Sequence, residues 1–134
     1  DVNAEQEYID LMNLKNLKTL VEKTGAKLVL SSSWRGMFDD EMHPQTDAAR
    51  IFTNILGKNG MFLFSKTGNF QGKRGAEVRD WIERHQDIER FVILDDAAFP
   101  DWQELKANWV RPDFRVGLTK DDVKKAIEIL DMNK

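Results

Sequence analysis

The fold is decided by residues 91–96, FVILDD, in which four apolar residues run directly into two adjacent aspartates. Four consecutive apolar residues are typical of a short strand that is covered on both faces. An earlier run, residues 27–30, ends in Leu-Val-Leu and opens directly onto the sequence SSSWR at 31–35. We expect both runs to be buried strands that end in polar clusters.

Segments with helical periodicity lie around these runs. Apolar residues at spacings of three and four, among them Leu17 and Leu20, predict a first helix that Thr24-Gly25 ends. Further helices are expected over 48–56 and 74–84 and after the capping residue Thr119, and short strands over 61–64 and 109–110. This alternation predicts a single α/β domain over residues 1–134, with a mainly parallel sheet covered on both faces.

The composition is that of one globular domain. With 41% hydrophobic and 32% charged residues, the chain can bury a core and lacks the profile of a disordered protein. The net charge of −3 gives no general reason to expect a nucleic-acid or membrane surface, and the absence of cysteine excludes disulfides, thiolate zinc sites and cysteine nucleophiles. No apolar run approaches the roughly 20 residues that span a bilayer. Residues 1–10 show no signal peptide, so we expect a cytoplasmic protein.

Three polar clusters are expected at one edge of this sheet, because ligands of parallel sheets bind beyond the carboxyl ends of the strands. They are the serines 31–33 with Arg35, the pair Lys73 and Arg74 at a helix start, and the pair Asp95 and Asp96. Hydroxyls bind phosphate oxygens, a cation offsets charge in the transition state, and carboxylates hold Mg²⁺, a hard ion that prefers oxygen ligands. Together the clusters predict a phosphoryl site.

Each cluster also has a purely structural interpretation. A serine run after a strand is usually a turn, and Lys73-Arg74 alone is more often a solvated helix start, although basic residues there oppose the helix dipole. Adjacent aspartates commonly cap turns, but like charges at the end of a buried strand repel each other unless a cation neutralises them. The occurrence of all three clusters in this order favours a functional site.

Three strings together resemble the haloacid-dehalogenase (HAD) superfamily: LVLSSSWR at 28–35, GKRGAEV at 72–78 with Trp81, and FVILDD at 91–96. More closely, they are similar to the HAD-type phosphatase domain found in Swiss-Army-knife RNA-repair proteins. The resemblance covers about Leu14 to Leu130 and includes VGLT at 116–119 before a helix. It implies a HAD-like Rossmannoid three-layer sandwich and a Mg²⁺-dependent phosphatase.

The resemblance assigns roles to the first two clusters. The second motif of the family falls on Ser32, with the serines on either side as alternative registers, and its hydroxyl would bind the transferring phosphoryl group. Ser33 and Arg35 would contact the same phosphate. The third motif, a cation that steadies the nucleophile and the phosphate, falls on Arg74 or Lys73. Arg74 is favoured because it directly precedes a glycine.

The fourth motif falls on Asp95 and Asp96, which would hold Mg²⁺ with Asp95 as the direct ligand. Residues 37–60 would be a small insertion near the site that shapes the choice of substrate. The substrate would be a nucleotide, a polynucleotide end or a small phosphoester. No obligate protein partner can be inferred.

One motif of the family has no counterpart. The first motif is a buried strand that ends in Asp-x-Asp before the first helix; its first aspartate attacks phosphorus and its second is the general acid and base. Residues 1–3, Asp-Val-Asn, have no strand before them and carry asparagine in place of the second carboxylate. The missing strand would be the central one of the sheet. We therefore expect the sequence to be N-terminally incomplete and inactive as it stands.

Two other functions fit part of the pattern. A non-catalytic HAD-like module that binds phosphate or nucleotide would use the same clusters without the first motif. A receiver domain also has an aspartate pair, a hydroxyl and a lysine around Mg²⁺, but its aspartate pair comes first, and here the order is reversed. The binding module is therefore the main alternative to the phosphatase.

Overall fold

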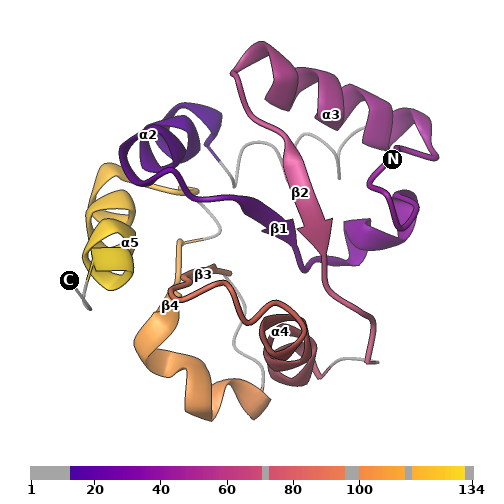
Figure 1. Ribbon diagram of the computed structural model, residues 1–134. Coiled ribbons are helices and arrows are strands. Elements are labelled where there is room, and N and C mark those ends of the chain that lie inside the picture. The colour runs from indigo at the N-terminus through magenta and orange to yellow at the C-terminus, as the bar shows by residue number, and fades with distance from the viewer. Residues whose placement is uncertain (1–12, 71–72, 96–99, 114–115, 132–134) are drawn as a thin grey trace. The chain divides into compact units, whose positions relative to one another are not determined.

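The protein has an α/β fold with parallel strand pairs, as the sequence predicted (Figure 1). The computed structural model describes residues 13–70, 73–95, 100–113 and 116–131, with the backbone alone at 33, 100 and 102–104. The chain divides into two compact units, which we name after the clusters that they carry. The serine unit is residues 27–88 with 99–101, and the aspartate unit is residues 1–26, 89–98 and 102–134.

The serine unit is built on two parallel strands. β1 (Leu28–Leu30) pairs with β2 (Leu63–Lys66). Parallel strands need a crossover connection, and here it contains a 3₁₀-helix, η1 (Ser33–Met37), followed by α3 (Asp47–Lys58). The buried face of α3 includes Phe52, which is completely inaccessible to solvent. β1 therefore ends directly at residues 31–34, which we name the serine loop, and the crossover helix packs into the core of the unit.

The helix after β2 carries the predicted basic cluster. α4 (Arg74–Glu83) is attached to β2, because the indole N–H of Trp81 donates a hydrogen bond of 2.9 Å to Ser65 Oγ. His85 stacks on the Trp81 ring at 3.8 Å between centroids and places its Nδ1 2.7 Å from the Trp81 carbonyl oxygen. These contacts fix the C-terminal half of α4 against β2. Lys73 and Arg74 lie at the opposite end of the helix.

Two boundaries in the serine unit differ from the prediction. α3 extends two residues beyond its expected end at residue 56, and β2 begins two residues later than expected. The helix ends in a Schellman motif, in which the N–H of Gly60 donates to the carbonyl oxygen of Gly57 and the N–H of Met61 to that of Leu56. Gly60 has the required positive φ of 74°. Met61 therefore belongs to the helix cap and not to the strand.

The aspartate unit contains two longer helices and a second parallel strand pair. α2 (Leu14–Thr24) packs beside α5 (Lys120–Asp131) (Figure 1). β3 (Ile93–Leu94) pairs in parallel with β4 (Trp109–Val110). A 3₁₀ segment, η2 (Pro100–Asn108), precedes β4, and its first two residues cluster with the serine unit. The strand at 109–110 is confirmed.

The helix ends of this unit follow the prediction, and one strand does not. Gly25, with φ 69°, ends α2 in the left-handed conformation. Thr119 Oγ1 accepts a hydrogen bond from the N–H of Asp122, whose carboxylate accepts one from the N–H of Thr119, so α5 begins with a reciprocal cap. The strand expected over 91–94 is shorter, because the carbonyl oxygen of Phe91 accepts from the side chain of Asn108 and not from a neighbouring strand.

The predicted insertion, residues 37–60, consists mainly of a loop closed by the antiparallel bridge between Phe38 and Pro44, followed by α3. Its effect on substrate choice stays a prediction, as do the single domain and the three-layer sandwich. Within the part of the chain that the structure describes, no helix is both long enough and apolar enough to cross a membrane.

Candidate phosphate and metal site

The serine loop is a capped turn at the end of β1. Ser32 is the N-cap of η1, and its Oγ accepts a hydrogen bond of 3.2 Å from the N–H of Trp34. The Trp34 ring in turn packs edge-to-face on Phe52, with 5.6 Å between centroids, which anchors the loop to α3. A hydroxyl that accepts one hydrogen bond keeps its own O–H as a donor. Ser32 can therefore cap the turn and donate to a phosphate at the same time. The side chain of Ser33 lies outside the described atoms.

The side chain of Arg35 holds the serine loop through hydrogen bonds to the backbone of the loop. Its Nη1 donates to the carbonyl oxygens of Ser31 at 2.7 Å and Ser32 at 3.0 Å, and its Nη2 lies 2.9 Å from Glu77 Oε2. The side chain is only 11% exposed, and among the described residues its buried Nε has no hydrogen-bond partner. The guanidinium thus joins the serine loop to α4. Direct contact of Arg35 with phosphate stays a prediction.

Glu77 is a fully buried carboxylate at the centre of this arrangement. Besides Arg35, its Oε2 accepts a hydrogen bond of 2.7 Å from the N–H of Phe70, in the loop before α4. Its Oε1 lies 3.4 Å from Arg74 Nε, which is close enough for an ion pair although the two are not aligned as a hydrogen bond. A buried charge is costly unless it is paired. The contacts Ser32–Arg35–Glu77–Arg74 therefore link the predicted second and third motifs within one unit.

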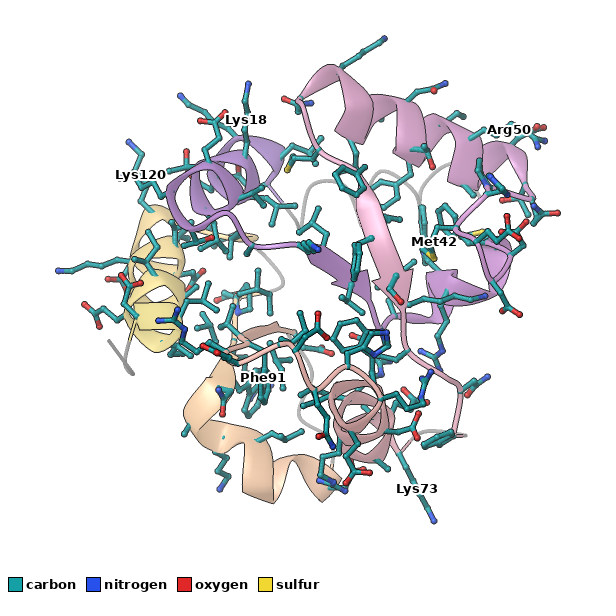
Figure 2. All side chains as sticks on the ribbon, in the orientation of Figure 1. Lys18, Met42, Arg50, Lys73, Phe91 and Lys120 are labelled. Carbon is teal, nitrogen blue, oxygen red and sulfur yellow. The ribbon has the colours of Figure 1, made fainter. Side chains whose placement is uncertain are left out.

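The two candidate third-motif cations have different surroundings. Arg74 is 17% exposed and contacts Glu77. Lys73 precedes α4 as its N-cap residue, makes no side-chain capping bond within the described part of the chain, and extends away from the helix into solvent (Figure 2). The structure therefore incorporates Arg74, and not Lys73, into the network around the serine loop.

The N-terminus of α4 already holds an anion, the carboxylate of Asp101. It accepts hydrogen bonds from the N–H groups of Gly75 at 3.1 Å and Ala76 at 2.9 Å. Burial raises the pKa of Asp101, but these two hydrogen bonds and the charge of Arg79 outweigh burial and hold the pKa below its ordinary value. Gly75 is required here, because a Cβ would collide with the carbonyl of Asp101. A phosphate would compete with Asp101 for these two N–H groups. We therefore expect a phosphate to be bound by side chains and not by the N-terminus of α4.

Asp95 follows β3 in the aspartate unit. Its N–H donates to the carbonyl oxygen of Val110 at 3.3 Å, and its own carbonyl oxygen accepts from Trp109 Nε1 at 2.8 Å. Its backbone position is thus set by β4. Asp96 lies outside the described residues, and the convergence of Asp95 with Ser32 on one pocket stays a prediction.

The carboxylate of Asp95 is a ligand of the type that Mg²⁺ prefers. Mg²⁺ is commonly held by one or two carboxylates together with waters and phosphate oxygens, so it does not require a cage of protein ligands. In the described ranges, no three Asp, Glu or His side chains gather as metal ligands. A Mg²⁺ site would therefore depend on the pair Asp95 and Asp96, and it stays a prediction.

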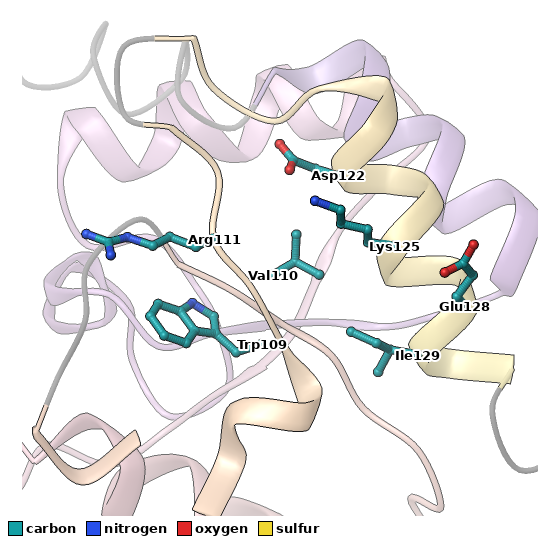
Figure 3. A pocket seen from close by; sticks show the side chains of 7 residues that line it. All are labelled: Trp109, Val110, Arg111, Asp122, Lys125, Glu128 and Ile129. Atoms are coloured by element: carbon teal, nitrogen blue, oxygen red, sulfur yellow. The ribbon is translucent and has the colours of Figure 1, made fainter. Parts of the chain in front are cut away.

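A separate hollow of about 490 Å³ lies in the aspartate unit between β4 and α5 (Figure 3). Trp109 and Arg111 line it on one side, and Lys125, Glu128 and Ile129 of α5 on the other. It contains none of the residues that the sequence predicted for the site.

Most of the sequence matches a known protein family. Residues 2–123 match the family described as the HAD domain in Swiss Army Knife RNA repair proteins. The chain belongs to this family. Comparisons of the HAD domain with curated proteins and with solved structures found no match. Membership agrees with the α/β architecture and with the parallel strand pairs.

Two residues of the HAD domain's site were not predicted from the sequence. Glu77 falls at helical spacing with Val78 and Trp81, on the buried face of α4. A carboxylate on an apolar stripe needs a cation, so this spacing was a usable signal. Asp101 gave no such signal, because its partners lie 25 and 26 positions earlier in the chain.

Proposed function

We propose that this HAD domain belongs to a Mg²⁺-dependent phosphohydrolase that acts on a nucleotide, a polynucleotide end or a small phosphoester. The observation that carries the proposal is the network Ser32–Arg35–Glu77–Arg74, because it joins the backbone of Ser32, a hydroxyl-bearing residue that follows β1, to a partly buried cation. A phosphoryl group needs both a donor for its oxygens and a positive charge.

Ser32 and Arg74 have complementary roles in the proposed reaction. The O–H of Ser32 donates to a non-bridging phosphate oxygen and orients the group. Arg74 offsets the negative charge that spreads over the equatorial oxygens in the transition state. Neither step requires Lys73, whose exposed charge contributes only long-range attraction.

Asp95 and Asp96 are proposed to hold the Mg²⁺. When bound, the ion would withdraw charge from a phosphate oxygen and orient the phosphoryl group for attack. The attacking carboxylate is assigned to no residue of this chain, because no Asp-x-Asp string occurs in its 134 residues.

The alternative is a module that binds phosphate or nucleotide without hydrolysing it. The observation that favours it is the same lack of an Asp-x-Asp string. The network around Glu77 would serve binding equally well, since it supplies a donor and a cation but no nucleophile.

Two measurements separate these functions. The first is Mg²⁺-dependent hydrolysis of an aryl phosphate and of a phosphorylated oligoribonucleotide by the full-length protein, for the wild type and Asp95→Asn. The phosphatase predicts activity that Asp95→Asn abolishes and that Asp121→Asn, an exposed control in the same unit, retains. The second is calorimetric titration of the chain with inorganic phosphate in Mg²⁺. Binding without hydrolysis of either substrate supports the module; no binding and no hydrolysis contradict both functions.

A further inference from the structure

We infer that Glu77 is a positioning residue of the phosphate site, which holds the serine loop through Arg35 and holds Arg74 directly. The inference deepens the proposed function and rests on it. It assigns a role to a residue that bears no reactive group in the proposed chemistry.

The burial of Glu77 argues against a role in stability alone. A carboxylate with 0% exposure loses its hydration, and its ion pairs seldom return more than this costs. An apolar side chain beside Val78 and Trp81 would stabilise the helix face as well or better. What a buried ion pair can supply is a defined geometry, because only one arrangement satisfies the charge.

The contacts that Glu77 makes with Arg35, Arg74 and Phe70 all lead to the proposed site. Arg35 transmits its position to the carbonyl groups of the serine loop, Arg74 is the proposed cation, and the N–H of Phe70 fixes the loop that leads into α4. One carboxylate thus sets the relative position of the phosphate donor and the phosphate cation.

The two arginines have different tasks in this arrangement. Arg35 uses both terminal nitrogens on protein acceptors, so it acts as a clamp. Arg74 meets Glu77 through Nε. Because a guanidinium is planar and rigid, a contact at Nε restrains the orientation of the whole group. The contact with Glu77 therefore restrains the orientation of the Arg74 guanidinium, which remains positively charged.

If Glu77 has this role, its neutralisation should change the affinity for phosphate in the direction opposite to the one that charge repulsion alone predicts. Removal of any negative charge near a phosphate site should tighten phosphate binding, because it removes repulsion. If Glu77 positions Ser32 and Arg74, its neutralisation should instead weaken binding. Asp80 is the matched control, since it is a carboxylate on the same helix that pairs with Arg84 at the surface.

The experiment is a titration of the full chain with inorganic phosphate in Mg²⁺, followed by calorimetry and by NMR of the Ser32 amide and the arginine Nε–H groups. In the wild type, phosphate should shift the Ser32 and Arg74 signals. Glu77→Gln should raise the Kd about tenfold, whereas Asp80→Asn should leave it within about twofold or lower it. The Arg74 Nε–H signal of Glu77→Gln should also lose its response to phosphate.

The outcomes separate the inference from the proposed function. If phosphate shifts neither Ser32 nor Arg74 in the wild type, the proposed phosphate site fails, and the inference with it. If both shift but Glu77→Gln binds phosphate as well as the wild type, or more tightly, the inference alone is wrong.

A measurement on the wild type covers the case in which Glu77→Gln does not fold. Arg74 and Arg84 both place Nε near a carboxylate, at 3.4 Å and 3.0 Å, but only the partner of Arg74 is buried. Solvent exchange of the Nε–H should be about tenfold or more slower for Arg74 than for Arg84. Equal exchange rates would show that Glu77 does not hold Arg74.

Discussion

The guanidinium of Arg35 lies 2.9 Å from the carboxylate of Glu77, 42 positions further along the chain. This buried pair joins η1, which follows β1, to α4. It also defines where substitutions should be most costly in the serine unit.

Removal of Arg35 should destabilise the protein strongly. Arg35→Ala leaves the buried Glu77 with one guanidinium fewer and the serine loop without its clamp, so we expect a loss of about 3–5 kcal/mol in the free energy of unfolding. Urea denaturation measures this loss. Arg50→Ala is the control, because Arg50 pairs with Asp47 at the surface, and it should change stability by less than about 1 kcal/mol. Equal losses for the two variants would contradict the prediction.

Asp101 should make stability depend on pH. Its pKa is lowered in the folded state, so its charged form stabilises the protein fully above the ordinary value of 3.8 and loses this contribution as the pH falls through the folded pKa. At neutral pH, Asp101→Asn should lower the free energy of unfolding by about 1–2 kcal/mol.

The difference between the wild type and Asp101→Asn should then shrink below about pH 4. Denaturation of both proteins across pH 2.5–7, with exposed Asp87→Asn as a control, checks this. A difference that grows in acid would show that the sign of the effect is wrong.

Two helical glycines should respond to alanine with opposite signs. Glycine in a helix is usually less stable than alanine by about 0.5–1 kcal/mol. Apart from its chain neighbours and the backbone of its own helix, a Cβ at Gly57 meets no atom within 4 Å, so Gly57→Ala should stabilise the protein by about this amount. A Cβ at Gly75 would collide with the Asp101 carbonyl, so Gly75→Ala should destabilise it. Thermal melts of the two variants measure both signs, and stabilisation by Gly75→Ala would exclude the close approach of Asp101.

Arg74 and Lys73 should differ in phosphate binding. Arg74→Gln should raise the Kd for inorganic phosphate about tenfold, because the partly buried cation of the network is lost. Lys73→Gln should raise it by less than about threefold, because an exposed charge is screened by solvent and salt. Calorimetric titration at one fixed ionic strength compares them. The reverse order would assign the third motif to Lys73.

Features that depend on neighbours in the sequence could be predicted. Gly25 ends α2 and Thr119 caps α5 through groups only a few residues away, so the local pattern contains both signals. The end of α3 shows the limit of this approach. Gly57 and Gly60 both look like stop signals, and only the backbone conformation selects Gly60.

Features that depend on distant partners could not be predicted in the same way. The serine loop and the basic helix start were recognised from their residue types, but nothing local shows that Arg35 turns inward to Glu77. Nor does anything local show that the carboxylate of Asp101 accepts hydrogen bonds from the N–H groups at the start of α4. Both outcomes depend on chain segments that meet only in the folded protein.

The Ser32 hydroxyl caps the turn at η1, and substitutions can separate this role from the proposed phosphate binding. Aspartate is as good an N-cap as serine, so Ser32→Asp keeps the turn at η1 while it places a negative charge against any incoming phosphate. Alanine at the same position would remove the cap and the ligand together. Ser32→Asp should therefore fold like the wild type and lose the proposed phosphate binding, whereas Ser32→Ala should lose both the cap and the binding.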